Sequence, residues 1–234
     1  MSLLRLEDIH TYYDKSYILQ GVSLEVRKGE IVALMGRNGV GKTTTLNSIM
    51  GFIKPKAGRI IFKDKDITPL KTFMIGRMGL GYVPQGRHLF PKMTVLENLK
   101  TGLIGKTGGG NLDRVFSLFP NIKDRMNRTA GSLSGGEQQA VAISRAILKN
   151  PDVLILDEPS TGLMPLFVSS LREIIKTLNK DGMTILLVEE RVPFVLSLAD
   201  RVYFMVKGKV EYSAAREELV DRKDILIHYL GIEA

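Results

Sequence analysis

The chain of 234 residues has no cysteine, no tryptophan and only three histidines. Without cysteine it can form no disulfide, no thiolate metal site and no cysteine nucleophile, which agrees with a reducing cytosol. No charged-then-apolar leader opens the sequence, and no stretch approaches the ~20 apolar residues of a membrane-spanning helix. We therefore expect a soluble protein that reaches a membrane only through a partner.

Positive charge is in excess, since the formal net charge is +8. Lys and Arg are dispersed along the sequence, however, and aromatic residues make up only 7% of it. Surfaces that bind single-stranded nucleic acid combine a basic groove with aromatic side chains on which bases stack, and this pattern is missing. We expect no nucleic-acid partner and interpret the excess charge mostly as solvated surface.

Residues 36–44, GRNGVGKTT, match the phosphate-binding loop pattern G-x-x-x-x-G-K-[ST]. An apolar strand over 30–35 precedes them and a short helix over 43–50 follows, which is the order such a loop requires. The glycines let backbone N–H groups converge on a triphosphate, Lys42 adds charge near the β- and γ-phosphates, and the Thr43 hydroxyl suits Mg²⁺. The predicted nucleotide-binding residues are Gly36, Arg37, Asn38, Gly39, Val40, Gly41, Lys42, Thr43 and Thr44, with Lys42 also a catalytic candidate.

An acidic pair follows the continuous apolar run 153–156, which predicts a strand buried on both faces. Asp157 and Glu158 would then lie at the carboxyl end of that strand, where open α/β sheets place ligands. We assign Asp157 to Mg²⁺ and Glu158 to the hydrolytic water. Alone, such a pair is usually a turn, and the phosphate loop upstream is what favours the functional interpretation.

Residues 133–139, LSGGEQQ, begin an amphipathic helix predicted over 135–149. A helix N-terminus with a hydroxyl and two glycines can bind an anion through free N–H groups. An ordinary serine-capped helix explains Ser134 but leaves the glycine pair unexplained. We predict a second nucleotide-binding surface made of Ser134, Gly135, Gly136 and Glu137.

The remaining pattern predicts the fold class, which is α/β. Residues 3–9 and 18–26 alternate as half-buried antiparallel strands do, and the segment 214–230 reads as helical and peripheral. We expect a P-loop NTPase core with a mostly parallel sheet, an N-terminal antiparallel β flank and an inserted helical subdomain. One domain would span 1–234, with its nucleotide-binding core in 1–84 and 151–234 and its helical subdomain in 85–150.

The strings GRNGVGKTT, LSGGEQQ and VLILDEPS together resemble the ATP-binding subunit of ABC transporters, over essentially the whole chain. The resemblance implies an ATPase that uses ATP and Mg²⁺. It also implies a head-to-tail dimer, in which residues 134–136 of one subunit close on the γ-phosphate held by Lys42 of the other. The implied partners are a second ATPase subunit, identical or a paralogue, two transmembrane permease subunits and, indirectly, an extracytoplasmic solute-binding protein. The implied location is the cytoplasmic face of the cell membrane.

Further roles carry over by the same resemblance. Tyr13 matches the aromatic residue that stacks on adenine, although the adjacent Tyr12 competes for this role and either could be an ordinary strand residue. Gln85 follows Tyr-Val-Pro and matches the glutamine that reaches Mg²⁺ and the attacking water. Without the resemblance, Gln85 would read as a polar residue after a proline.

Two positions depart from the family pattern. Glu190 stands where a histidine usually contacts the γ-phosphate, and none of the three histidines of the chain lies there. A carboxylate near a phosphate is repulsive unless Arg191, a proton or a water intervenes. We retain Glu190 as a catalytic candidate in a tuned or weak site. Met164 replaces a common aspartate and so removes a polar contact expected across the dimer.

These departures, the segment 84–99 and the terminal Tyr-Leu-Gly at 229–231 resemble the short ATPase of branched-chain amino acid importers and their urea or short-amide relatives. Branched-chain or other hydrophobic amino acids are the first expectation for the solute, and urea or a short amide is the alternative. The helical subdomain would dock the permease, with 128–132 as a transmission segment. A non-transport ABC ATPase acting on nucleic acid or ribosomes, or a P-loop kinase, is less expected.

Overall fold

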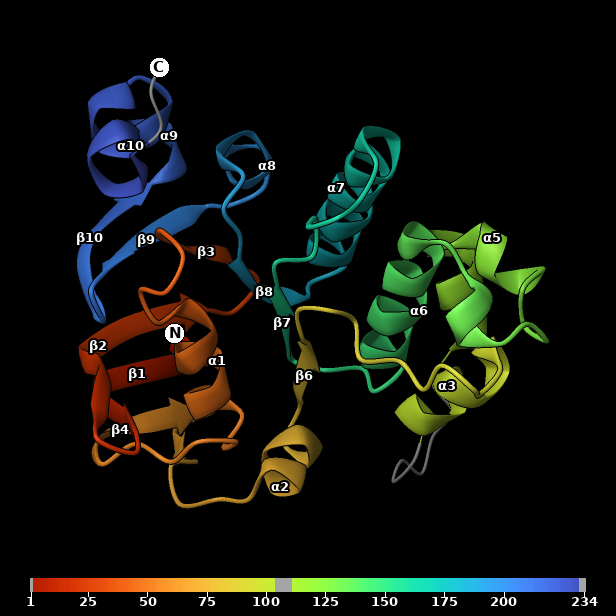
Figure 1. Cartoon of the computed structure of the whole chain (residues 1–234), viewed down its shortest axis with the longest axis horizontal. Helices are drawn as coiled ribbons and strands as arrows, with labels where there is room; N and C mark the ends of the chain where they lie inside the picture. Colours follow the sequence, from red (N-terminus) through yellow and green to blue (C-terminus); the bar gives the residue numbers. More distant parts are fainter. Residues whose placement is uncertain (1, 104–110, 232–234) are drawn as a thin grey trace.

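The computed structural model describes residues 2–103 and 111–231 (Figure 1). Within these residues the chain forms one six-stranded sheet in the order β10-β9-β3-β8-β7-β6 and one four-stranded antiparallel sheet in the order β2-β1-β4-β5. The larger sheet consists of β3 (Ile31–Met35), β6 (Leu80–Val83), β7 (Val153–Asp157), β8 (Thr184–Val188), β9 (Arg201–Val206) and β10 (Lys209–Ala215). The smaller sheet consists of β1 (Ser2–Tyr13), β2 (Ser16–Arg27), β4 (Ala57–Phe62) and β5 (Lys65–Asp66).

The larger sheet is parallel except for β10, which pairs antiparallel with β9 at one edge. Every residue of β3, β7 and β8 is buried, as expected of strands covered on both faces. The α/β class with a mostly parallel sheet is therefore confirmed. The helices are α1 (Lys42–Ile49), α2 (Thr72–Arg77), α3 (Val95–Leu103), α4 (Leu112–Leu118), α5 (Pro120–Lys123), α6 (Gly135–Ile147), α7 (Pro165–Lys180), α8 (Val192–Leu196), α9 (Arg216–Val220) and α10 (Lys223–Leu230).

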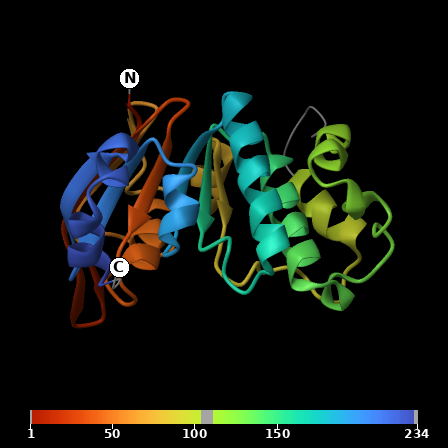
Figure 2. The ribbon, with the colours of Figure 1, turned by 90° about the horizontal axis from the view of Figure 1, so that it is seen from above.

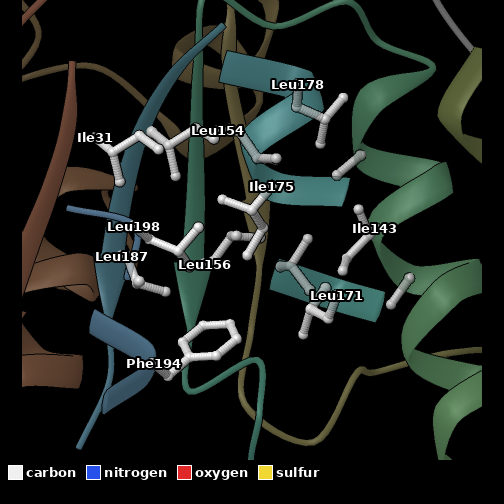
Figure 3. Close-up of a cluster of buried hydrophobic side chains, with 14 of the residues drawn as sticks. Ile31, Ile143, Leu154, Leu156, Leu171, Ile175, Leu178, Leu187, Phe194 and Leu198 are labelled. Atoms are coloured by element: carbon white, nitrogen blue, oxygen red, sulfur yellow. The ribbon is translucent and has the colours of Figure 1, made fainter. Parts of the chain in front are cut away.

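Two hydrophobic cores lie on the two faces of this sheet. Because successive side chains of a strand point to opposite faces, Val32 and Leu34 of β3 pack with α1 and the antiparallel sheet, while Ile31 packs into the other core. That second core joins the sheet to α6, α7 and α8, and Figure 3 shows Leu171 of α7 and Ile143 of α6 within it. The β flank therefore covers the face of the sheet opposite to α7.

Helices α3 to α6 leave the sheet between β6 and β7, which are neighbouring parallel strands. Figures 1 and 2 both show these helices at one end of the molecule and the antiparallel sheet at the other. Asn111 caps the start of α4, since its side chain accepts a hydrogen bond from the backbone N–H of Arg114.

The predicted helical segment over 214–230 is wrong at its start. Strand β10 continues to Ala215, which pairs with Arg201 of β9, and α9 begins only at Arg216. The two alanines favour a helix by propensity, but hydrogen bonding along β9 decides their conformation. None of the helices in the described part of the chain combines the length and apolar character needed to cross a membrane.

Candidate nucleotide-binding site

The phosphate loop connects β3 to α1 as the sequence predicts. Any other residue at position 36 would force the backbone of the loop or of β9 to move, because a Cβ there would lie 2.4 Å from the backbone oxygen of Met205 in β9. Gly41 has φ 111°, in the left-handed region that favours glycine. The loop therefore owes its course to the close packing of β9 and to a glycine with positive φ before α1.

Lys42 is held over this loop by its ammonium group. The side chain is 4% exposed, and Nζ donates hydrogen bonds to the carbonyls of Gly36 at 2.7 Å and Arg37 at 3.0 Å. Its third contact is an ion pair with Glu190 Oε1 at 2.8 Å. An ammonium group has three donors, so these contacts use all of them. The structure thus brings two predicted site residues, Lys42 and Glu190, into direct contact.

Asp157 ends β7 beside the start of α1 and is 1% exposed. Tyr82 donates a hydrogen bond from its hydroxyl to Asp157 Oδ2 at 3.3 Å, while Oδ1 is buried without a partner among the described residues. Burial raises the pKa of Asp157 to about 6; the nearby Thr43 hydroxyl opposes this rise, and the charge of Glu158 adds to it. The carboxylate is thus poorly compensated within the protein, as expected of a group that binds a cation.

The residues predicted to hold Mg²⁺ suit that ion. Thr43, Asp157 and Gln85 offer hydroxyl, carboxylate and amide oxygens, the hard ligands that Mg²⁺ prefers. Within the described residues, no cluster of three or more His, Cys, Asp or Glu side chains could hold a metal by itself. Mg²⁺ usually takes one or two carboxylates and is otherwise held by phosphate oxygens and water. When bound, it would neutralise charge on the phosphates.

Replacing Asp157 by Asn is expected to stabilise the protein without metal. The raised pKa means that the fold favours the protonated acid, so the stability contributed by this group is full below pH 3.8 and lost as the pH rises through about 6. At pH 8 in EDTA, we expect Asp157→Asn to raise the free energy of unfolding by about 3 kcal/mol. Urea unfolding measures this, and the exposed Asp64→Asn is the matched control. A less stable variant at pH 8 would contradict this assignment.

Glu158 follows β7 with φ 46°, a left-handed conformation that is uncommon outside glycine. Its Oε2 accepts hydrogen bonds from Gln85 Nε2 at 2.7 Å and from the Thr161 hydroxyl at 3.2 Å. Gln85 lies just after β6, so residues far apart in sequence meet at the carboxyl ends of two neighbouring strands. A fixed carboxylate in this position can accept a proton from a water molecule.

Ser134 begins α6 with a capping box. Its hydroxyl accepts from the Glu137 N–H, and the Glu137 carboxylate accepts from both the N–H and the hydroxyl of Ser134. These hydrogen bonds, with a further one from Arg125, lower the pKa of Glu137. The Glu137 side chain is therefore engaged within the cap, and its predicted contact with nucleotide stays a prediction.

Gly136 has a reason to be glycine that the sequence did not reveal. A Cβ at this position would lie 2.7 Å from Cδ2 of Phe167 in α7, so glycine lets α6 and α7 pack closely. At Gly135, the nearest atom to such a Cβ is the end of the flexible Arg87 side chain, at 3.1 Å. The argument that only a ligand explains the glycine pair is therefore wrong for Gly136.

A double-mutant cycle tests this packing. Gly136→Ala forces the added methyl group against the Phe167 ring, and we expect it to destabilise the protein by about 1–3 kcal/mol. In the Phe167→Ala background the same substitution should cost less, with a coupling energy of about 1 kcal/mol or more. Thermal and urea unfolding of the four proteins give these values. Additive losses would show that Gly136 serves something other than this contact.

The two surfaces predicted to bind phosphate do not meet within one chain. Lys42 opens α1, which packs on one face of the large sheet, whereas Ser134 begins α6, which packs into the core on the other face. Figures 1 and 2 show α1 and α6 separated by the strands β6 and β7. If both surfaces bind one triphosphate, the second surface must come from another copy or a partner chain.

The two candidate adenine-stacking residues differ in their surroundings. Tyr13 is 45% exposed at the end of β1, and its hydroxyl lies 3.4 Å from Asn47 Nδ2 of α1. The Tyr12 ring stacks on Tyr17 across the β1–β2 hairpin at a centroid distance of 4.4 Å. Tyr13 therefore has the more available ring, beside the helix that follows the phosphate loop.

Comparison with known proteins agrees with this geometry. Residues 19–161 match the family described as ABC transporter. The chain is 38% identical to the high-affinity branched-chain amino acid transport ATP-binding protein BraG of Pseudomonas aeruginosa, over 98% of this chain and all of that protein. It is 34% identical to the probable branched-chain amino acid transport ATP-binding protein LivF of Archaeoglobus fulgidus, over 98% of this chain and 99% of the relative.

A lipopolysaccharide export relative and solved structures are also similar. The ATP-binding protein LptB of Escherichia coli K12 is 33% identical over 99% of this chain and 98% of its own. A nucleotide-free ATP-binding cassette from an ABC transporter superposes with a TM-score of 0.85 at 31% identity, over all of both chains. A dimeric ATP-binding cassette bound to ADP and Pi gives a TM-score of 0.82 at 28% identity, over 91% of this chain and 98% of that one.

Proposed function

Because the chain belongs to the ABC transporter family, we propose that it is the subunit whose ATP hydrolysis powers the import of branched-chain or other hydrophobic amino acids. The chain is an ATPase of this family. The observation that carries the proposal is the cluster of Lys42, Asp157 and Glu158 where β3 and β7 end, together with the full-length similarity to two branched-chain amino acid transport proteins.

In the proposed reaction each residue has one task. Backbone N–H groups of the phosphate loop and Lys42 hold the terminal phosphates, and Thr43, Asp157 and Gln85 hold Mg²⁺. Glu158, oriented by its hydrogen bond from Gln85, accepts a proton from a water molecule aligned with the γ-phosphorus. A bond forms from the water oxygen to phosphorus as the bond to the ADP oxygen breaks, and ADP and inorganic phosphate leave.

We propose that two ATPase subunits bind head to tail, with Ser134 of one facing the triphosphate on Lys42 of the other. The separation of these surfaces within one chain supports this arrangement. Two apolar side chains that follow the acidic pair in sequence, Met164 and Leu166, are 74% and 81% exposed and are suited to a covered interface. The second subunit is an identical copy or a paralogue.

The membrane partners follow from the same proposal. Two permease subunits would dock on the helical segment 85–150, with residues 128–132 as the transmission segment just before Ser134. The ATPase would then lie at the cytoplasmic face of the membrane, and an extracytoplasmic solute-binding protein would deliver the solute. A urea or short-amide importer is the alternative within the same architecture.

Reconstituted transport tests the solute. The intact complex that copurifies with the chain would be placed in liposomes with its binding protein and assayed for ATP-dependent uptake of labelled leucine, valine and urea. We expect uptake of leucine and valine, which a Glu158→Gln complex should lack. Uptake of urea without leucine would favour the alternative, and copurification with lipopolysaccharide transport proteins would contradict import.

A further inference from the structure

Glu190 forms an ion pair with Lys42, whereas the sequence predicted that Lys42 contacts the phosphates of the nucleotide. Glu190 Oε1 lies 2.8 Å from Lys42 Nζ, and Oε2 lies 3.4 Å from Asn38 Nδ2 in the same loop. The other two donors of the Lys42 ammonium are bonded to loop carbonyls. A phosphate oxygen that binds Lys42 must therefore replace one of three existing acceptors, and Glu190 is the only one of them on a side chain.

Charge makes the carboxylate a competitor of the phosphates. Lysines in loops of this kind pair with the β- and γ-phosphates, so Glu190 and the end of the nucleotide share one cation. Like charges that close together repel, and in a partly buried site this repulsion is screened less than in water. ATP brings one more negative charge to this end of the site than ADP does.

We propose that Glu190 is a determinant of nucleotide affinity that competes with the terminal phosphate for Lys42, so that it weakens ATP binding more than ADP binding. The inference rests on the proposed nucleotide-binding role of the loop and assigns a function to the departure at position 190. It makes Glu190 a specificity-determining residue rather than the proton acceptor, which remains Glu158.

The surroundings allow the Glu190 side chain to move while its backbone stays in place. The neighbouring Glu189 is buried, and its carboxylate accepts hydrogen bonds from the N–H groups of Glu190, Arg191 and Ser160. Glu190 also lines a cavity of about 730 Å³ whose walls include Arg172 and Arg191. The carboxylate can therefore turn from Lys42 toward this cavity, whose lining is mostly apolar and includes Arg172 and Arg191.

Binding measurements with Glu190→Gln test the proposal. The substitution keeps the size of the side chain and removes its charge. In EDTA, isothermal titration calorimetry should show that the variant binds ATP about tenfold more tightly than the wild type does. Its affinity for ADP should rise by no more than about threefold. The matched control is Glu173→Gln on the exposed side of α7, which changes the net charge equally and should leave both affinities within about twofold.

Each outcome decides the matter. A gain in ATP affinity of at least about threefold that exceeds the gain for ADP supports the proposal. A gain in ATP affinity below about threefold, or one that does not exceed the gain in ADP affinity, overturns the proposal while leaving the ATPase assignment intact. If the wild-type protein and both variants bind no ATP, the nucleotide-binding role of the loop fails and this inference fails with it.

Discussion

Replacement of Glu158 by Gln is expected to lower kcat for ATP hydrolysis by about 10²- to 10⁴-fold. Glutamine has nearly the same shape but cannot accept a proton from the attacking water. Affinity for ATP should change by less than about threefold, because Glu158 contacts Gln85 and Thr161 rather than the phosphate loop. Release of inorganic phosphate measures the rate, and equilibrium titration with ATP measures the affinity.

The control is Glu173→Gln, which removes a carboxylate of the same kind from the exposed surface of α7 and should keep the wild-type rate. Phosphate release by Glu158→Gln within tenfold of the wild type would show that another group takes the proton. Asp157, the residue before Glu158, would then be tested in the same way. Its raised pKa makes its carboxylate a better proton acceptor than that of an ordinary aspartate.

Two inactive variants are expected to restore activity when they are mixed. Lys42→Met removes the ammonium from the phosphate loop, and Ser134→Arg places a bulky cation at the start of α6. Each alone should lose about 100-fold or more in kcat. In a head-to-tail dimer of the two variants, however, one of the two composite sites carries both substitutions and the other carries neither, so one site is intact.

With random pairing, the equimolar mixture should regain up to about a quarter of the wild-type rate. The rate should rise with total protein concentration, as it should for the wild type. A mixture that stays as inactive as its components, under conditions where the wild type dimerises, would rule out composite sites. Unaltered activity of Ser134→Arg by itself would do so more directly, because then the cap of α6 serves its own helix only.

The parts of the site that are local in sequence could be predicted. The loop at 36–44 lies between a strand and a helix as expected, since its apolar run, glycines and Lys-Thr-Thr all act over a few residues. The buried strand β7 follows in the same way from a continuous apolar run. The acidic pair at the end of β7 then lies beside the loop because β3 and β7 are parallel strands of one sheet.

The parts that depend on contacts between distant residues could not be predicted. Glu190 meets Lys42 across 148 positions of sequence, and the sequence alone indicates repulsion from phosphate without naming the cation that attracts it. The Phe167 ring that requires Gly136 comes from another helix. Strand β10 takes the first two residues of the segment predicted to be helical, because β9 offers hydrogen-bond partners that propensity does not include.

The strand order has a consequence for synthesis of the chain. Strand β3 delivers the phosphate loop, yet its two neighbours, β8 and β9, lie in the last quarter of the sequence. During translation, the apolar strand before the loop therefore stays without its sheet partners until nearly the whole polypeptide has left the ribosome. Such long-range parallel pairing folds slowly and leaves an aggregation-prone edge exposed, so chaperones that shield nascent chains are expected to matter more for this protein than for one built from local hairpins.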